Sequence, residues 1–216
     1  MRTDRIEKII NSMRQHNMDQ MVISDPSTIF YLTGKFVASG ARLFALCLDT
    51  QGACTFFINS LQTDYAPLAE GAEIVWYTDS DDSIQILAKK IRTGGTVGID
   101  KNWPSSFLLR LMAAADAKYV LNSGIIDYIR MVKDDGEIQL MRETQAVNEK
   151  VISEMFQYVS PELTEQKHHR MLHEMYCAHG ADGYNIIGVV AYGKSCGYAH
   201  HKPDGTTPAA GDCIMI

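Results

Sequence analysis

Long apolar runs are missing from the sequence. No stretch approaches the roughly 20 consecutive apolar residues that a membrane-spanning helix needs, so no membrane association is predicted. The amino-terminal residues, MRTDRIEKII, are charged and amphipathic, and they lack the apolar run of a secretion signal. Both observations favour a cytoplasmic protein.

Cysteine and positive charge are also scarce. The chain has 5 cysteines, an odd number without a C-x-x-C pair, and we predict reduced, mostly buried thiols. The formal net charge is −6, whereas a nucleic-acid or anionic membrane surface requires clustered positive charge. We therefore expect no nucleic acid among the partners of this chain.

Several common signatures of enzymes are absent. The stretches GTVGID and TGG match neither G-x-G-x-x-G nor the G-K-[ST] of a phosphate-binding loop, so no nucleotide site is predicted. No serine lies in a G-x-S-x-G elbow. Any chemistry must therefore come from other residue types.

What is present is an ordinary globular composition, with 46% hydrophobic residues in a chain of 216. This is enough apolar material for a hydrophobic core. Predicted strands and helices alternate up to about residue 122, and residues 44–58 read as two strands around a turn at Gln51-Gly52. This pattern indicates a layered α/β domain whose sheet is partly antiparallel. We expect helices at 3–16, 25–34, 82–95 and 104–115, and further strands at 20–24, 73–78, 96–100 and 118–121.

The pattern changes after NSG (122–124), which we interpret as a domain boundary. Thr164 is a favourable N-cap, and Glu165 follows it in the first turn of a helix. Long helices followed by strands indicate the beginning of an α+β domain, and we therefore predict two domains, 1–124 and 125–216. The elements expected in the second domain are a helix at 136–159, the helix after Thr164, and strands at 184–193 and 212–216.

The stretch HHRMLHEMYC (168–177) resembles part of a zinc-protease motif. His173 and Glu174 begin an H-E-x-x-H string, but that motif needs a second histidine four residues after the first, and Cys177 stands there. His169 and His173 share one face of the predicted helix. We interpret this face as a solvated polar surface, and a metal site is the alternative.

Two adjacent histidines, His200 and His201, precede the turn-forming residues KPDG. If the pair ends a strand, the two side chains point to opposite faces, and only one can face a pocket. From spacing alone, the plainer interpretation is a loop histidine without a chemical role. Cys196 and Cys213 flank the pair, and we expect inert buried thiols because a cysteine nucleophile needs an activating partner.

The ordered pattern of the whole chain resembles the Xaa-Pro dipeptidases (prolidases) and aminopeptidases P. DPSTIFYLTG (25–34) resembles the N-x-x-Y-L-T-G signature of their amino-terminal domain. IRMVKDDGEIQLMRETQAVNEK (129–150) resembles the R-x-x-K-x-x-x-E-I helix that opens their catalytic domain. Residues 188–216 resemble the segment that precedes their metal site, because His200 lies eleven residues before a Gly-Asp pair and an apolar strand.

The resemblance implies a creatinase-type α/β amino-terminal domain (1–124) and the first part of a pita-bread metallopeptidase domain (125–216). Members of the family bind two divalent ions, usually manganese, cobalt or zinc, through two aspartates, a histidine and two glutamates. The first aspartate would come directly after Ile216. We therefore expect this chain to hold none of these ions and to be inactive by itself.

The resemblance also implies roles for single residues. It aligns His200, and not His201, with a histidine that contacts the substrate and stabilises the tetrahedral intermediate, which an imidazole N–H can do without binding metal. Tyr184 and Ile187 are further candidates for lining the substrate pocket. The implied substrate is a proline-containing dipeptide or oligopeptide, cleaved before proline, and the implied assembly is a homodimer.

Two alternatives to a metal-dependent peptidase stay open. One is a creatinase-like hydrolase of the same fold that needs no metal, and the other is a non-catalytic pita-bread interaction module. An aspartate directly after Ile216, followed by the remaining ligands, would discriminate among the three.

Overall fold

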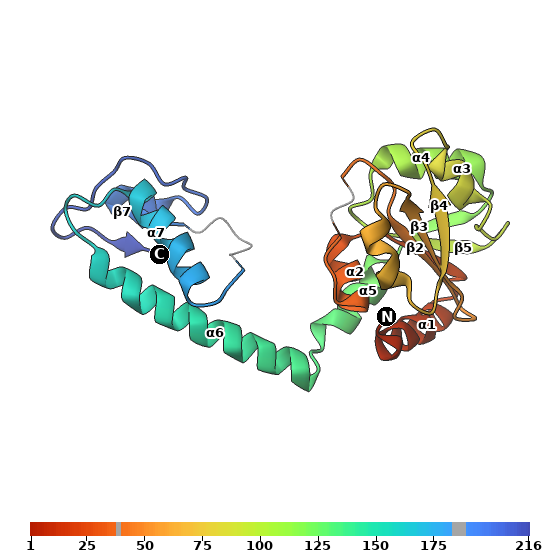
Figure 1. Cartoon of the computed structure of the whole chain (residues 1–216), viewed down its shortest axis with the longest axis horizontal. Helices are drawn as coiled ribbons and strands as arrows, with labels where there is room; N and C mark the ends of the chain where they lie inside the picture. The colour runs from red at the N-terminus through yellow and green to blue at the C-terminus, as the bar shows by residue number, and fades with distance from the viewer. Residues whose placement is uncertain (38–39, 183–188) are drawn as a thin grey trace. The chain divides into compact units, whose positions relative to one another are not determined.

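The computed structural model of the chain describes residues 1–37, 40–182 and 189–216. Contacts divide the chain into two compact units, Met1–Val132 and Lys133–Ile216, which run from red to green and from teal to blue in Figure 1. Each unit has its own sheet and its own hydrophobic core.

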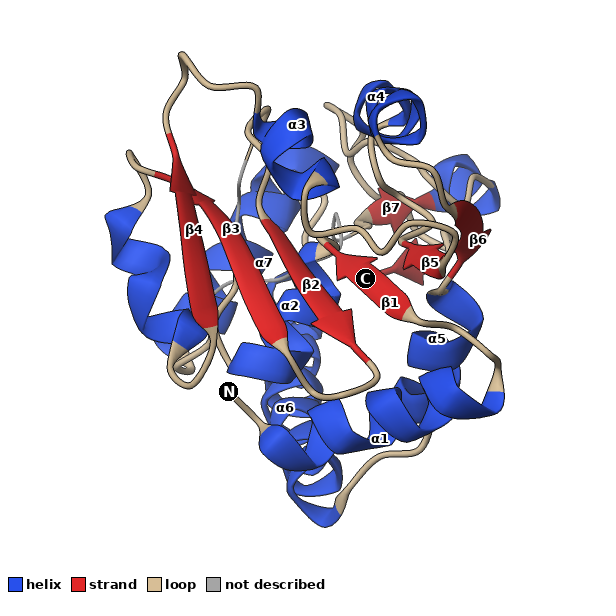
Figure 2. Ribbon diagram, turned by 90° about the vertical axis from the view of Figure 1, so that its right-hand side faces the viewer, coloured by secondary structure: helices blue, strands red, loops and turns tan. Residues whose placement is uncertain are grey.

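A six-stranded sheet in the order β4-β3-β2-β1-β5-β6 forms the centre of the first unit (Figure 2). Strand β2 runs antiparallel to β1 and β3, whereas the pairs β1–β5, β5–β6 and β3–β4 are parallel. The predicted α/β fold with a partly antiparallel sheet is confirmed. The strands are β1 (Gln20–Ile23), β2 (Ala45–Asp49), β3 (Cys54–Asn59), β4 (Glu73–Tyr77), β5 (Thr96–Ile99) and β6 (Lys118–Leu121).

Helices cover both faces of this sheet. Because successive strand side chains point to opposite faces, Met21 and Ile23 belong to the core beneath α1, α2 and α5, whereas Val22 belongs to the core beneath α3 and α4. The helices are α1 (Thr3–Gln15), α2 (Pro26–Thr33), α3 (Ser83–Ala88), α4 (Ser105–Ala114) and α5 (Ser123–Met131), with a 3₁₀ helix η1 at Thr63–Ala69.

Helix α2 shows how local signals set the boundaries of an element. The side chain of Asp25 accepts a hydrogen bond from the Thr28 N–H at 2.8 Å, and Pro26 is the first helical residue. Gly34 ends the helix with a φ of 76°, a conformation that favours glycine. The helix predicted at 25–34 is therefore confirmed with its cap and its stop.

Helix α5 was not predicted, and it extends the first unit beyond the boundary expected at 122–124. Ile125 and Ile126 are buried in the core of the first unit, so the division between the units lies after Val132. The residues NSG resemble a linker in sequence, but Asn122 occupies the N-cap position of α5. Only the packing of α5 against the first unit shows that these residues begin a helix and are not a linker.

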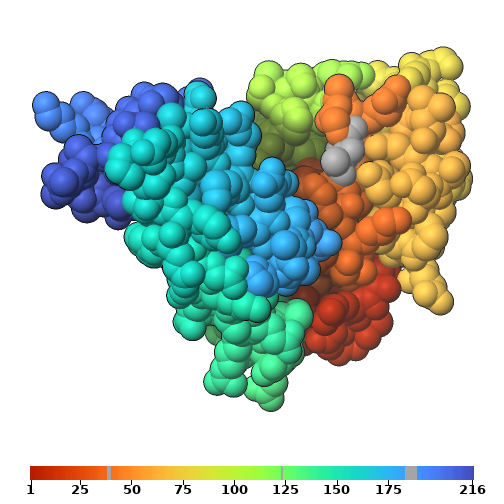
Figure 3. Space-filling view, turned by 60° about the vertical axis from the view of Figure 1, so that its left-hand side comes forward, coloured from red at the N-terminus to blue at the C-terminus, as the bar shows by residue number. Residues whose placement is uncertain are grey.

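The second unit consists of two helices and a small antiparallel sheet. Helix α6 begins with a capping box, in which the Glu137 N–H donates to the Asp134 side chain at 2.8 Å and the Asp134 N–H donates to the Glu137 side chain at 3.0 Å. Figure 3 shows α6 and α7 (teal to light blue) and the carboxy-terminal segment (dark blue) on the surface of this unit. The elements are α6 (Asp135–Met155), η2 (Phe156–Tyr158), α7 (Glu165–Ala178), β7 (Ala191–Tyr192), η3 (Gly193–Gly197) and β8 (Ile214–Met215).

The strands predicted in the second unit are confirmed in part. Of the strand expected at 184–193, only Ala191 and Tyr192 form β7, and residues 184–188 lie outside the described part. Strands β7 and β8 pair antiparallel. The side chain of Tyr192 belongs to the core of this unit, together with Val151, Met155, Leu172 and Val190.

The cysteines differ from the expectation of mostly buried thiols. All five are free, but only Cys47 is buried, while Cys177 and Cys213 are exposed. Burial raises the pKa of Cys47 to about 12, so this thiol is inert. In the described part of the chain, no helix combines the length and the apolarity that crossing a membrane would require.

Candidate active-site loop

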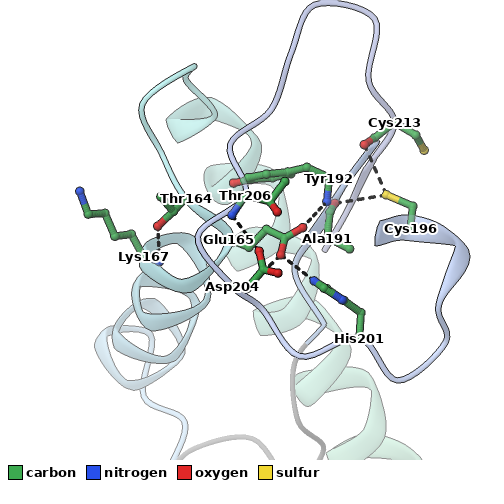
Figure 4. A network of polar contacts seen from close by, with 10 residues as sticks. All are labelled: Thr164, Glu165, Lys167, Ala191, Tyr192, Cys196, His201, Asp204, Thr206 and Cys213. Atoms are coloured by element: carbon green, nitrogen blue, oxygen red, sulfur yellow. Dashed lines mark hydrogen bonds and ion pairs between the residues drawn. The ribbon is translucent and has the colours of Figure 1, made fainter. Parts of the chain in front are cut away.

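The two adjacent histidines lie in an irregular loop after η3. The His201 N–H donates to the Tyr198 carbonyl at 3.1 Å and closes a turn over residues 198–201. The pair lies in this turn and not at a strand end, so the predicted alternation of strand side chains does not separate the two rings. The turn separates them instead, because His200 is exposed whereas His201 points to the buried Glu165 (Figure 4).

Glu165, at the start of α7, holds this loop. Its side chain is 0% exposed, and its Oε1 accepts a hydrogen bond from the Tyr192 N–H at 2.9 Å. Its Oε2 lies 2.6 Å from the His201 Nε2 and accepts from the Asp204 N–H at 3.1 Å. A carboxylate only accepts, so the His201 Nε2 carries the hydrogen. These partners make the buried charge tolerable, because an unpaired one would cost several kcal/mol.

The backbone of the same loop completes the amino end of α7. The first N–H groups of a helix have no helical acceptor. Here the Glu165 N–H donates to the Thr206 carbonyl and the Gln166 N–H donates to the Asp204 carbonyl, both at 3.0 Å. The loop and the helix start therefore form one hydrogen-bonded body, which places His200 at a defined position.

His168 and Tyr192 form a second buried pair, which is joined to Glu165 through the Tyr192 N–H. The Nδ1 of His168 lies 2.7 Å from the Tyr192 hydroxyl, and its Nε2 lies 3.1 Å from the Met155 carbonyl. A carbonyl only accepts, so Nε2 carries the hydrogen and Nδ1 accepts from the hydroxyl. Burial lowers the pKa of His168 and raises the pKa of Tyr192 to about 12, so both side chains are neutral near pH 7.

Glu165, His201 and Asp204 form the one convergent group of potential metal ligands within the described residues, their ligand atoms lying within 4.8 Å of one another. Two carboxylates and an imidazole are suitable donors for zinc. However, Glu165 already accepts three hydrogen bonds, and the Thr206 hydroxyl and N–H hold the pKa of Asp204 below its usual value. The group is satisfied by protein donors and does not fit a two-metal centre, which requires shared carboxylates.

The zinc-protease-like stretch does not form a metal arrangement. His173 is exposed, its Nε2 lies 3.8 Å from the Cys177 Sγ, and neither joins the convergent group. The solvated face expected for this helix applies to His173 and Glu174, but His168 lies on the buried face.

The cysteines that flank the histidine pair differ from each other. The Cys196 Sγ lies 3.3 Å from the carbonyls of both Ala191 and Cys213, and burial raises the pKa of this thiol. Cys196 is therefore a poor nucleophile at neutral pH. Cys213 is exposed, against the expectation of a buried thiol.

Sequence reasoning placed Glu165 in the first turn of its helix but assigned it no further role. The signal was incomplete because the partners of Glu165 lie far along the chain, 36 residues away for His201 and 39 for Asp204. Tyr184 and Ile187, the other residues predicted to line a pocket, lie outside the described residues.

Two family models match the chain in succession. Residues 5–132 match the Creatinase/Prolidase N-terminal domain, and residues 139–216 match Metallopeptidase family M24. Among curated proteins, the uncharacterized peptidase SAR1786 of Staphylococcus aureus (strain MRSA252) is 22% identical over 206 residues, covering 92% of this chain and 57% of the relative. The chain spans 57% and 61% of the length of two curated relatives that it matches.

Solved structures share the fold of the chain. A recombinant prolidase from Thermococcus sibiricus superposes with a TM-score of 0.91 at 22% identity, covering 99% of this chain and 60% of that one. The dipeptidase PepE from Mycobacterium ulcerans superposes with a TM-score of 0.90 at 22% identity, covering 98% and 58%. The chain therefore shares a known fold and spans part of its length.

Proposed function

The chain belongs to the family that joins a creatinase/prolidase amino-terminal domain to an M24 metallopeptidase domain, and from this premise we propose that the complete protein is an Xaa-Pro peptidase. It hydrolyses the bond before proline in a dipeptide or a short peptide. That bond is a tertiary amide without an N–H, so the site must recognise the proline ring by shape. The prolidase and dipeptidase with similar folds support this substrate class.

One observation carries the proposal, namely that a buried carboxylate holds the loop that presents His200. The neighbouring His201 is bound to Glu165, while His200 is exposed and makes no side-chain hydrogen bond within the described residues. The imidazole N–H of His200 is thus available to a substrate. We propose that it donates to the negative charge that develops on the substrate oxygen in the tetrahedral intermediate.

Divalent metal ions are the cofactors that M24 membership implies. We propose that the complete protein uses two such ions, manganese, cobalt or zinc. The group of Glu165, His201 and Asp204 does not fit them, and we place their ligands in the part of the relatives that this chain does not span. On this proposal the 216-residue chain has no peptidase activity of its own.

We further propose that the complete protein acts in the cytoplasm as a homodimer. Light scattering coupled to gel filtration measures the mass directly, and a monomeric mass at working concentration would contradict this assignment.

The function is tested on the full-length protein with Ala-Pro and Gly-Pro as substrates. His200→Ala should lower kcat by roughly 10²–10³-fold, the effect of losing one oxyanion donor, without changing the bound metal. His173→Ala, an exposed histidine of the same unit, is the matched control and should leave kcat unchanged. Full turnover by His200→Ala would contradict the role of His200, and full turnover after metal removal would favour a metal-independent hydrolase.

A further inference from the structure

A cavity of about 230 Å³ lies in the first unit, where the carboxyl ends of β1, β5 and β6 meet. Figure 2 shows these three strands side by side. The chain continues from β1 to β2 on one side and from β5 to β6 on the other. Such a reversal is the position at which open α/β sheets bind ligands, in the crevice beyond the strand ends.

Asn122 lines this cavity and has an unusual environment. It occupies the N-cap position of α5, where an asparagine side chain normally accepts a hydrogen bond from the helix, but it makes no such bond. Its side chain is 0% exposed, and neither its Oδ1 nor its Nδ2 has a partner in hydrogen-bond geometry in the described protein, although the Nδ2 lies close enough to Asp100 to lower the pKa of that carboxyl. A buried carboxamide in this state calls for one donor and one acceptor from a bound molecule.

Asp100 lies at the end of β5 in the same cavity and is 6% exposed. Its Oδ2 accepts hydrogen bonds from the backbone N–H groups of Ser24 and Asp25. Burial raises the pKa of Asp100. The N–H groups of Ser24 and Asp25 and the side chain of Asn122 lower this pKa by less than burial raises it. A cationic group placed in the cavity would therefore find a carboxylate that favours it.

The rim of the cavity carries both signs of charge. Lys101 and Asp127 form an ion pair at 2.7 Å, and Asp25 and Arg130 lie nearby. The amino end of α5, with its positive helix dipole, is also at this rim. The lining carries three carboxylates and two cations, so it can meet both charges of a zwitterionic ligand.

We propose that this cavity binds a free α-amino acid as a zwitterion. Its ammonium and carboxylate groups sit on one carbon, so they present the adjacent donor and acceptor that the Asn122 carboxamide lacks. The ammonium lies toward Asp100 and the carboxylate toward the amino end of α5. A nucleobase fits less well, because Ile126 is the single apolar side chain among the lining residues.

The inference uses residues of the first unit alone and does not depend on the proposed peptidase activity. Binding is tested on the 216-residue chain by titrating its ¹H–¹⁵N NMR spectrum with free L-amino acids, glycine and proline included. N-acetyl amino acid amides, which lack both charges, are the comparison ligands. We expect saturable shifts at Asp100, Asn122 and α5 with at least one free amino acid, and none with the blocked compounds.

Variants then locate the site. Asn122→Ala should weaken the Kd roughly tenfold or more, because two hydrogen bonds to charged groups are lost. Gln62→Ala is the matched control, since Gln62 Oε1 is another buried, unpartnered side-chain oxygen of this unit that does not line the cavity. If Asn122→Ala does not fold, Asn122→Leu provides the same test, because it keeps a similar volume and removes both polar atoms. The proposal is overturned if no free amino acid binds, if blocked compounds bind equally, or if the Asn122 variant keeps the original Kd.

Discussion

Each unit contains a group of buried polar side chains beside a loop, and the two groups differ in how completely the protein satisfies them. In the second unit, buried Glu165 and His168 are satisfied by protein groups, and no buried side-chain polar atom of its described residues lacks a partner. In the first unit, both polar atoms of Asn122 remain unpartnered beside the buried Asp100. Both groups lie where strands or helices end, so position alone does not explain the difference.

The difference indicates two distinct uses of buried polarity. A network that is complete within the protein fixes the geometry of a loop, here the loop that presents His200. An incomplete one leaves hydrogen-bonding capacity for something else to fill. The comparison therefore predicts large stability losses when a partner is removed from the second unit, and small ones when Asn122 is truncated in the first.

Removing Glu165 should have the largest effect. Glu165→Ala leaves the His201 ring and the Tyr192 and Asp204 N–H groups without their acceptor, and we expect the second unit to lose about 3 kcal/mol or more of unfolding free energy. Hydrogen exchange of the Tyr192 and Asp204 amides measures this. Glu174→Ala, an exposed glutamate on the same helix, should change little, about 0.5 kcal/mol at most. If the Tyr192 and Asp204 amides of Glu165→Ala exchanged as slowly as in the wild type, the hydrogen bonds of Glu165 would not stabilise the loop.

Adding a side-chain atom at Gly98, which packs against Asn122, should have the next largest effect on stability. A Cβ added at Gly98 would lie 2.5 Å from the Met18 Sδ and 2.8 Å from the Asn122 Cβ, so Gly98→Ala should cost the first unit about 1–3 kcal/mol. Gly124→Ala is the control, because nothing lies within 4 Å of its added Cβ and alanine favours a helix.

Denaturant unfolding followed by tryptophan fluorescence measures this effect. Both tryptophans of the chain, Trp76 and Trp103, belong to the first unit, so the signal reports that unit alone. Equal midpoints for the two glycine variants would show that the region around Asn122 is loosely packed.

The pH dependence of the two units should have opposite signs. Burial lowers the pKa of His168 from 6.5, so the unfolded chain gains a proton at higher pH than the folded one. The contribution of His168 is therefore complete above pH 6.5 and is lost as the pH falls through that value toward the folded pKa. Burial raises the pKa of Asp100 from 3.8, so its contribution is present below that value and is lost as the pH rises through the folded pKa.

Hydrogen exchange of β7 amides above and below pH 6.5 tests the sign for the second unit. His168→Gln, which retains a donor and an acceptor without titrating, should flatten the dependence. A wild-type stability that rises on acidification through this range would contradict the neutral state of His168.

Truncating Asn122 should have the smallest effect. Asn122→Ala removes two unpartnered polar atoms, so we expect a change within about 1 kcal/mol, in either direction. Asn59 is the matched control, because its equally buried carboxamide donates to Asp79 at 2.9 Å and accepts from the Leu61 N–H at 3.0 Å. Asn59→Ala should therefore cost more. The same fluorescence measurement compares them, and a larger loss for Asn122→Ala would remove the contrast between the two asparagines.

Local signals predicted most of the fold. The Asp25-Pro26 start and Gly34 stop of α2, and the mostly apolar sequence of β1, which is buried on both faces, depend on residues a few positions apart. Helix α5 was missed because NSG carries the same signal as a linker, and the described residues confirm the strand expected at 184–193 only at Ala191 and Tyr192.

The candidate site was predicted less completely. The sequence, through its family resemblance, pointed to His200, but the reason offered for separating it from His201 was wrong, because the pair lies in a turn and not at a strand end. The partner that holds the loop, Glu165, was not predicted to have this role, since no local pattern connects it to His201.

The sequence by itself determined the order and type of most elements, and the family, because these follow from periodicity, capping residues and ordered motifs. Only the tertiary structure decided which polar side chains are buried and whether they are satisfied there. Burial of Glu165 depends on a loop 36 residues further along the chain, and the open carboxamide of Asn122 depends on the meeting of three strand ends. Such contacts join residues that are distant in sequence, and local patterns do not record them.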